Sequence, residues 1–539
     1  MNRYAAMTVT VRTGPASGLF SVDVERRYRR NVYVLREHLE LRMPCRTARL
    51  LWRDERMIRA RPGISYHVDR WTDRFVEMTF SGRRFALVDA PDLSGMDVFV
   101  GRLINRRVAP RRSCRIVLEL DDHRNHLAVY AARCKRHWYP PSPRILRDRR
   151  FRRRGEVVEN HVLFRVGQGP VVVKRRFPRG FDAAVVFTDH ADQSAPGPLR
   201  ALLLGRSDAT IEHPVGGFIG NGLHLTKTLF ARGGPSPQMD DPGVRALAGR
   251  AATKGIEFGP HSATPRRDSR LATEQALKLF SGLGHTWIDH QPDTNCEAYS
   301  CRGWRRSSPF FLADLLFKSG FRYVWTGQDV RLRGGRLDMF QPLKWRFRPS
   351  ILFPFQVSAG GRGVLWLWRS VWYYRTPASL DRGLSQAHLD RLATQHGLFI
   401  AHTYLDDHHP PGHRRHRMAL VLRRAGIYVL HPAFRLVLAR LGAAQRSGRI
   451  WVPSLGELAD YLVVWNRIFV QPLSRNRFLV RNPSTHAIKG LVVTIGAHVT
   501  HVSGPAASSV RILRSGPTSL LELNVPASDS VIVTFDRDV

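Results

Sequence analysis

The sequence has 539 residues and a mass of 61.4 kDa, with 43% hydrophobic and 10% aromatic residues. This composition excludes wholesale disorder, and the length predicts two to four domains instead of one small core. The opening segment MNRYAAMTVTVRTGPASG has no continuous apolar stretch of the kind a secretory signal needs, and no run reaches the length of a membrane span. We therefore expect a cytoplasmic protein.

The net charge of +40 comes from 84 Lys+Arg residues against 44 Asp+Glu residues. Such a charge attracts nucleic acids and other polyanions. The basic residues are nevertheless spread along the chain, and only residues 144–154 (RILRDRRFRRR) form a dense block. We favour a general use of arginine in place of lysine, and a nucleic-acid partner is not expected.

The five cysteines are odd in number and irregularly spaced, so they do not form a disulfide framework. Cys296 and Cys301 are close in sequence, but their spacing is not that of a common zinc knuckle and no second pair follows. The pattern predicts reduced thiols.

The first part of the chain, residues 1–176, is predicted to be an α+β domain. Residues 24–42 carry apolar side chains at helical intervals, which indicates an amphipathic helix. Strand-like runs follow at residues 48–52, 74–80, 84–88 and 114–120.

The pattern changes over residues 177–470, where short apolar runs alternate with helical segments. This alternation is typical of parallel α/β folds. The predicted strands are residues 183–190, 256–262, 285–290, 321–325 and 398–404. After them, residues 471–539 are rich in short strands and polar turns, which predicts a β-sandwich.

Several of the predicted parallel strands end in acidic or imidazole side chains. In a barrel, strand ends converge on one mouth, so residues far apart in sequence become neighbours. A single histidine at a strand end is usually structural, but a repeated pattern indicates a shared site. The residues concerned are Asp189, His190, Asp192, His261, Asp289, His290 and His402.

The order of these motifs resembles the polysaccharide deacetylase superfamily. Residues 187–192 (FTDHAD) are similar to its first motif, which carries a catalytic base and a metal-binding aspartate. Residues 259–264 (GPHSAT) are similar to its metal-binding His-Ser/Thr-x-x-His motif, and residues 400–402 (IAH) to its last, which carries an acid histidine. The resemblance covers residues 180–470 and implies a distorted (β/α) barrel.

The resemblance implies that Asp189 is the catalytic base and that His402 is the acid. A divalent metal, expected to be zinc, would be held by Asp192, His261 and a third ligand. Pro265 stands where the family has its second metal-binding histidine. His290 or His190 could replace that ligand, and the wider spacing of Asp189 and Asp192 leaves open which of them is the base.

Substrate binding is expected from aromatic and polar residues near these strand ends. Trp287 and Trp325 could stack on sugar rings, although each also fits ordinary core packing. Asn295 and Glu297 lie in a polar segment after the third predicted strand and are candidates for contacts with the sugar.

The main hypothesis is a metal-dependent hydrolase that removes N-acetyl groups from a sugar or polysaccharide. One alternative is a catalytically silent carbohydrate-binding relative, which the proline at position 265 favours. A glycosidase on the same type of barrel and a nucleic-acid-binding protein are the other two.

Overall fold

The fold is that of a computed structural model of the chain. The structure describes residues 4–13, 18–44, 47–51, 57–59, 65–69, 76–80, 83–91, 93, 95–103, 111–122, 150–166, 172–192, 194–234, 237–265, 268–289, 311–330, 332, 337–340, 351–356, 363–373, 376–407, 419–474, 476–503, 509–514 and 518–537.

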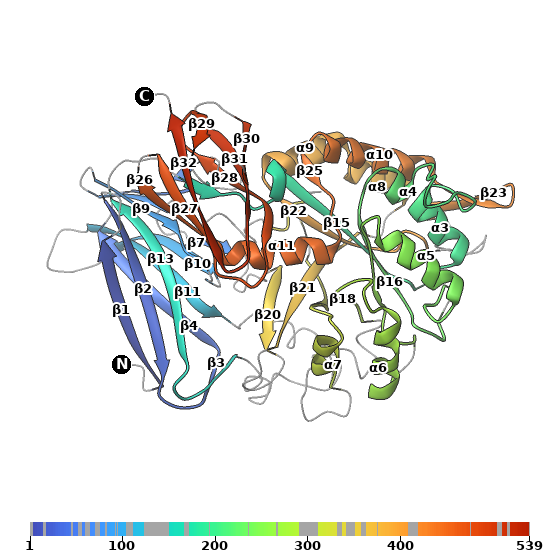
Figure 1. The fold of residues 1–539 in the computed structure, drawn as a ribbon, viewed down its shortest axis with the longest axis horizontal. Coiled ribbons are helices and arrows are strands. Elements are labelled where there is room, and N and C mark those ends of the chain that lie inside the picture. The colour runs from blue at the N-terminus through green and yellow to red at the C-terminus, as the bar shows by residue number, and fades with distance from the viewer. Residues whose placement is uncertain are drawn as a thin grey trace.

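The N-terminal region contains two larger antiparallel sheets packed face to face (Figure 1). The first has the order β1 (Ala5–Thr13), β2 (Leu19–Tyr28), β13 (Val157–Val166), β9 (Arg83–Asp89), β8 (Val76–Phe80), β5 (Thr47–Leu51) and β6 (Met57–Arg59). The second has the order β4 (Arg36–Pro44), β11 (Arg111–Asp122), β10 (Gly95–Leu103) and β7 (Ser65–Asp69). Side chains from both sheets, including Val24, Leu87 and Ile116, form one buried cluster.

The helix predicted over residues 24–42 is wrong. This segment forms the end of β2, then β3 (Val32–Val34), which pairs with β12 (Arg150–Arg152), and then β4. Along β2 every second side chain, at Val22, Val24, Arg26 and Tyr28, is buried, which is the period of a strand. The described part of residues 1–176 contains strands and no helix.

The C-terminal region also contains two antiparallel sheets around a hydrophobic cluster. One has the order β26 (Phe469–Ser474), β27 (Arg477–Asn482), β32 (Asp529–Arg537) and β29 (Val499–Ser503). The other has the order β14 (Val172–Lys174), β28 (Ile488–Ile495), β31 (Ser519–Val525) and β30 (Val510–Arg514). β14 thus belongs to this sheet although it precedes the parallel strands in sequence.

The central region is a nearly closed, barrel-like sheet of parallel strands. Their order is β17 (Ile256–Pro260), β16 (Leu225–Leu229), β15 (Ala183–Asp189), β22 (Leu398–Thr403), β21 (Val364–Trp372), β19 (Tyr323–Asp329) and β18 (Thr286–Trp287). The two end strands meet where Ile288 N donates to Pro260 O at 3.2 Å and Ser262 N donates to Ile288 O at 3.1 Å. β20 (Leu352–Gln356) pairs antiparallel with β21, and β25 (Ile450–Trp451) pairs with the start of β15.

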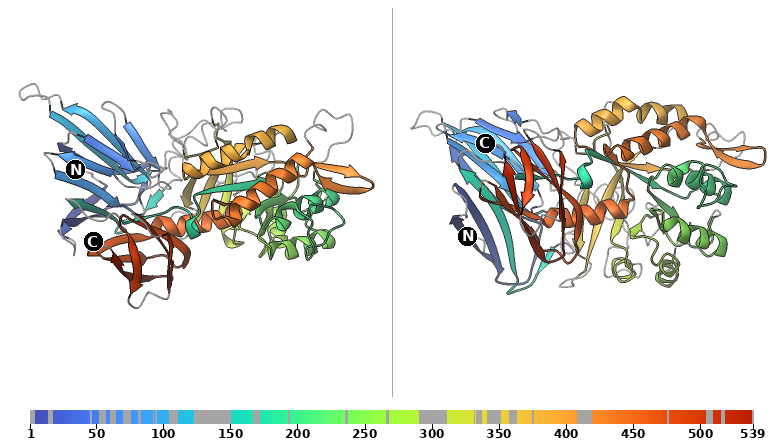
Figure 2. Two further views of the ribbon diagram at one scale, coloured as in Figure 1. Left: turned by 90° about the horizontal axis from the view of Figure 1, so that it is seen from above. Right: turned by 45° about the horizontal axis from the view of Figure 1, so that its top comes forward.

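Helices lie outside these parallel strands (Figures 1 and 2). They are α3 (Pro196–Leu204), α4 (Gly217–Gly220), α5 (Pro242–Ala252), α6 (Arg270–Leu279), α7 (Ala313–Lys318), α8 (Pro377–Gly383), α9 (Gln386–Thr394), α10 (Pro432–Arg446) and α11 (Leu455–Arg467), with a hairpin of β23 (Val421–Arg424) and β24 (Ile427–Leu430). Side chains of Asp241, Ser269 and Ser454 cap α5, α6 and α11. Among the described residues, no helix is long and apolar enough to cross a membrane.

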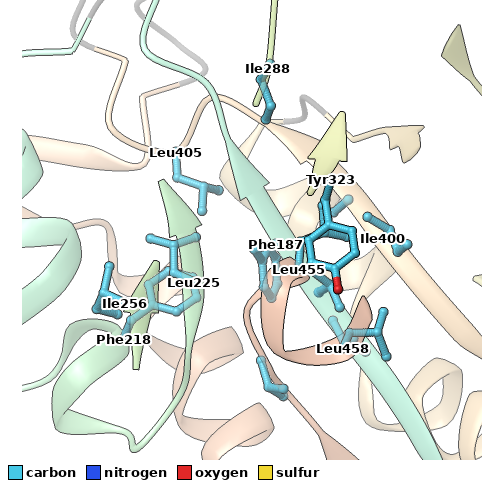
Figure 3. Packing of buried hydrophobic residues seen from close by; sticks show 14 of the residues in the cluster. Phe187, Phe218, Leu225, Ile256, Ile288, Tyr323, Ile400, Leu405, Leu455 and Leu458 are labelled. Carbon is cyan, nitrogen blue, oxygen red and sulfur yellow. The ribbon is translucent and has the colours of Figure 1, made fainter. Parts of the chain in front are cut away.

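β15 is central to the barrel because it pairs with β16, β22 and β25. All seven of its side chains are buried, as expected for a parallel strand covered on both faces. Phe187 packs edge-on against Phe218 with ring centroids 5.5 Å apart, and Figure 3 shows it with Leu455 and Ile400 in the same core. The parallel strands predicted around residues 183, 256 and 398 are confirmed.

One cysteine differs from the sequence expectation. Cys114 on β11 is disulfide-bonded and fully buried, whereas the spacing of the cysteines predicted reduced thiols. Cys296 and Cys301 lie outside the described residues.

Candidate active site at the barrel mouth

Three histidines that follow or end parallel strands converge at the C-terminal mouth of the barrel. His190 follows β15, His261 follows β17, and His402 lies near the end of β22. The ring of His190 stacks on that of His402 with centroids 3.9 Å apart, and it lies 5.1 Å from that of His261. The convergence expected from the strand ends is therefore present.

The first pair at the mouth is His261 with Asp192. His261 Nε2 lies 2.9 Å from Asp192 Oδ1. The imidazole is buried, whereas 31% of the Asp192 side chain is exposed, so the pair sits between the barrel interior and solvent. The next residue, Ser262, has a φ of 60°, so the backbone adopts a left-handed conformation directly after His261. An imidazole nitrogen beside a carboxylate oxygen is a typical pair of zinc ligands.

The second pair is His402 with Asp329. His402 Nδ1 lies 3.2 Å from both carboxylate oxygens of Asp329, at the end of β19. His402 Nε2 lies 3.2 Å from the hydroxyl of Tyr404. A carboxylate on Nδ1 orients the ring and stabilises its protonated form, which is the arrangement of a general acid or base.

His190 lies between the two pairs and is fully buried. Burial, together with the neighbouring His402 and His261, holds the pKa of His190 well below its ordinary value, so the ring is neutral. Within the described part of the chain, its Nε2 atom has no hydrogen-bond partner. A neutral imidazole whose Nε2 makes no hydrogen bond is better suited to act as a metal ligand than a protonated imidazole is.

Asp189, the predicted base, lies beneath this cluster and is completely buried. Lys227 Nζ donates to its Oδ2 at 2.7 Å, while Thr403 Oγ1 at 3.2 Å and the backbone N–H of Leu405 donate to its Oδ1. Burial raises the pKa of Asp189 to about 7, and the ammonium of Lys227 opposes that rise. Both oxygens are thus engaged by the protein.

Lys227 connects Asp189 to a second carboxylate. Its Nζ donates to Asp406 Oδ1 at 2.6 Å and to Ser194 Oγ at 3.0 Å. Burial lowers the pKa of Lys227, but the two carboxylates raise it above its ordinary value. The side chain of Lys227 therefore carries a proton. Beside this ion triad, burial and then the charges of Asp406 and Asp192 raise the pKa of Asp407 to about 8.

The donor set for a metal is incomplete in the part of the chain that the structure describes. Asp192 and His261 supply two suitable ligand atoms, but no group of three or more His, Cys, Asp or Glu side chains there is placed to hold a metal ion. His290, the predicted third ligand, lies outside the described residues. The residues present fit two positions of a zinc site.

The predicted sugar-binding residues are placed differently from one another. Trp287 is fully buried, and its Nε1 donates to Asp289 Oδ1 at 2.6 Å. Trp325 is 5% exposed and lies in the wall of the site. Asn295 and Glu297 lie outside the described residues.

The sequence reading missed Lys227, Asp329, Trp372, Tyr404, Asp406 and Asp407. Lys227 stands between two threonines in the strand LTKTL, and a lysine in a buried strand requires a carboxylate partner. Asp406 and Asp407 follow closely after His402, so the strand-end pattern used elsewhere could have found them. Trp372, at the end of β21, is 50% exposed and lies edge-on to His402 at 4.7 Å.

Comparisons with known proteins assign no family. No protein-family model matches the sequence, and neither does any curated protein. A solved structure described as "Crystal structure of Agd3 a novel carbohydrate deacetylase" aligns with a TM-score of 0.27 and 12% identity. The alignment covers 55% of this chain and only 46% of that one. Similarity at this level establishes neither fold nor function.

Proposed function

We propose that this protein is a metal-dependent hydrolase that removes N-acetyl groups from a sugar or polysaccharide. The observation that carries the proposal is the convergence of two distinct pairs on one barrel mouth. His261 with Asp192 is suited to hold a metal, and His402 with Asp329 is suited to move a proton. A site of this composition serves hydrolysis of an amide, which needs an activated water and a proton for the leaving amine.

The metal is proposed to be zinc, held by Asp192 and His261 with His290 as third ligand. His190 is the alternative third ligand, because its Nε2 has no partner within the described part of the chain. Bound zinc supplies a water of lowered pKa and polarises the acyl oxygen.

The proton steps are assigned to residues of the chain. Water adds to the amide carbon, and a carboxylate, proposed to be Asp189, accepts the proton that the water loses. His402 then donates a proton from Nε2 to the sugar nitrogen as the C–N bond breaks, giving acetate and a free amine. Asp329 stabilises the imidazolium before that transfer.

The role of Asp189 has a structural alternative. Because Asp189 is fully buried against Lys227 and Leu405, it could instead hold the segment after β22 in place. Asp189→Asn separates the two roles. A base predicts a fall of roughly 10²–10⁴-fold in kcat per folded, metal-loaded molecule, whereas a purely structural role predicts loss of stability with kcat per folded molecule little changed.

The sugar is proposed to stack on Trp372. Its indole ring is half exposed beside His402, whereas Trp287 and Trp325 are buried. A pyranose ring on this surface would place a substituent near the imidazole. Trp372→Ala should raise KM with a smaller effect on kcat.

The test is acetate release from a panel of N-acetylated oligosaccharides by the full-length, zinc-supplemented protein, with metal content measured on the same samples. His261→Ala should lose both metal and acetate release. The matched control is His224→Ala, because His224 lies at the opposite end of the barrel, paired with Glu457. Activity that survives His261→Ala would exclude the proposed site.

Pro265 and the incomplete donor set favour one other candidate, a carbohydrate-binding protein without catalysis. It predicts metal-free protein that binds N-acetylated oligosaccharides in calorimetry and releases no acetate.

A further inference from the structure

A chain of hydrogen bonds leads away from His402 into the wall of the barrel. Asp329, which contacts His402 Nδ1, accepts from Ser370 Oγ at 2.8 Å on its Oδ1. Ser370 Oγ in turn accepts from Trp325 Nε1 at 3.0 Å. We propose that Ser370 and Trp325 are positioning residues that fix the orientation and tautomer of the His402 imidazole. The inference rests on the proposed function, in which His402 is the acid.

The donors and acceptors of this chain can be arranged in only one direction. The indole N–H of Trp325 can only donate, so the hydroxyl of Ser370 accepts there and turns its own proton toward Asp329. An ionised carboxylate can only accept, so the remaining interaction of Asp329 takes a proton from His402 Nδ1. His402 Nε2 is then the atom that gains and loses a proton.

Asp329 and Ser370 are brought together by an irregular pairing between β19 and β21. Trp325 pairs with Trp368, and the next pair along β19 and β21 is Asp329 with Ser370, with a shift of register between them. Val330 N also donates to Ser370 O at 2.6 Å. Such irregularities redirect side chains near active sites, and here the shift places the Asp329 carboxylate opposite the Ser370 hydroxyl.

The Trp325 ring also packs against the histidines that its N–H helps to orient. It lies edge-on to His402 and to His190, with centroids 4.9 Å away in both cases. At 5% exposure it offers almost no face to a sugar. Within the described residues, the side chains that face His402 include His190, Asp329, Tyr404, Trp325 and Trp372.

Trp368 provides a matched control on the neighbouring strand. It is a buried tryptophan whose ring centroid lies 6.5 Å from that of Trp325, and its Nε1 has no hydrogen-bond partner among the described residues. Replacing either tryptophan by phenylalanine removes the same atoms, but only Trp325→Phe breaks the chain to His402.

The experiment compares Ser370→Ala, Ser370→Thr, Trp325→Phe and Trp368→Phe in the full-length protein. Two readouts are used: kcat and KM for acetate release against pH, and the imidazole ¹⁵N resonances of His402, assigned by difference with His402→Gln. Ser370→Ala and Trp325→Phe should lower kcat about 10–100-fold with KM little changed. Both should shift the His402 Nδ1 resonance toward a mixture of tautomers. Ser370→Thr, which keeps the hydroxyl, and Trp368→Phe should resemble the wild type.

The two readouts separate this inference from the proposed function. If the wild type releases no acetate from any substrate, the proposed function fails. The ¹⁵N resonances alone then show whether Ser370 and Trp325 fix the tautomer of His402. Unchanged resonances in Ser370→Ala and Trp325→Phe overturn the inference. A loss of kcat that matches a loss of metal or folded protein, or that Trp368→Phe shares, also overturns it.

Discussion

Buried charged side chains are surrounded differently at the two ends of the barrel. At the N-terminal end, the carboxylate of Glu257 on β17 accepts four neutral hydrogen bonds, from Thr226 Oγ1, Thr286 Oγ1 and the backbone N–H groups of His285 and Gly456, at 2.7–2.9 Å. Gly456 lies in the first turn of α11, where the helix dipole also favours a negative charge. This carboxylate is fully satisfied.

At the C-terminal end, carboxylates and imidazoles face one another, and three of them have shifted pKa values. Asp189 and Asp407 titrate higher than usual and His190 lower. Among the described residues, His190 Nε2 and Asp406 Oδ2 have no hydrogen-bond partner. Unsatisfied polar atoms cost stability and are retained mainly where they serve function. The comparison separates an end that stabilises the barrel from an end that is suited to chemistry.

The largest effect on this comparison is expected from Lys227→Met. The substitution leaves Asp189 and Asp406 buried together without their cation, and breaking a buried pair in this way costs about 3–5 kcal/mol. The free energy of unfolding, measured with urea, should fall by that amount. The triple variant that adds Asp189→Asn and Asp406→Asn should recover a large part of it, and no recovery would contradict a charge mechanism.

Glu257→Ala should be the next largest. Four buried donors lose their acceptor, and we expect a cost of about 2–4 kcal/mol. Because Glu257 lies at the end away from the histidines, kcat per folded molecule should not change. A fall in kcat at full occupancy of the native state would show that the two ends are coupled.

Asp407 connects stability to pH. Its pKa rises from 3.8 to about 8 on folding, so between these values the folded protein holds a proton that the unfolded chain releases. The free energy of unfolding therefore falls as pH increases from about 4 to 8, and the loss is complete above that range. In metal-free protein, Asp407→Asn should show a smaller fall, because only the raised pKa of Asp189 still contributes to it, and above pH 8 the variant should be more stable than the wild type by about 1–3 kcal/mol. Parallel pH profiles for the two proteins would contradict the raised pKa.

The smallest effect is expected from Glu457→Gln at the stabilising end. Glu457 pairs with His224 at 2.6 Å, but both side chains are partly exposed. Its carboxylate also lies in the first turn of α11. We expect the substitution to lower the free energy of unfolding by about 0.5 kcal/mol, and by less at high salt. If Glu457→Gln lowers the free energy of unfolding as much as Glu257→Ala does, solvent exposure does not explain the difference expected between the two carboxylates.

The parallel strands and their histidine ends were predictable because each signal is local. The apolar run of β15 and the strands around His261 and His402 are visible in sequence, and barrel topology then brings their ends together. The partners of these residues were not predictable in the same way. Asp329 reaches His402 only through a shift of register between β19 and β21, which no local pattern encodes.

In the N-terminal region, the sequence predicted a helix over residues 24–42 where the structure has strands. Val24, Tyr28 and Val32 fall at helical intervals, whereas Val22 with Val24 and Leu39 with Leu41 alternate as in strands. Pairing with β13 and β11, which lie far along the chain, decides between the two. These pairings select the strand from the two patterns that the segment carries.

The pairing of β14 with β28 has a consequence for biosynthesis. A ribosome releases β14 before it makes the entire barrel, and the partner strand emerges only afterwards. At about 5–20 residues per second, β14 waits on the order of tens of seconds without its partner strand. Native pairing in that sheet is therefore a late event, which follows the synthesis of the whole barrel.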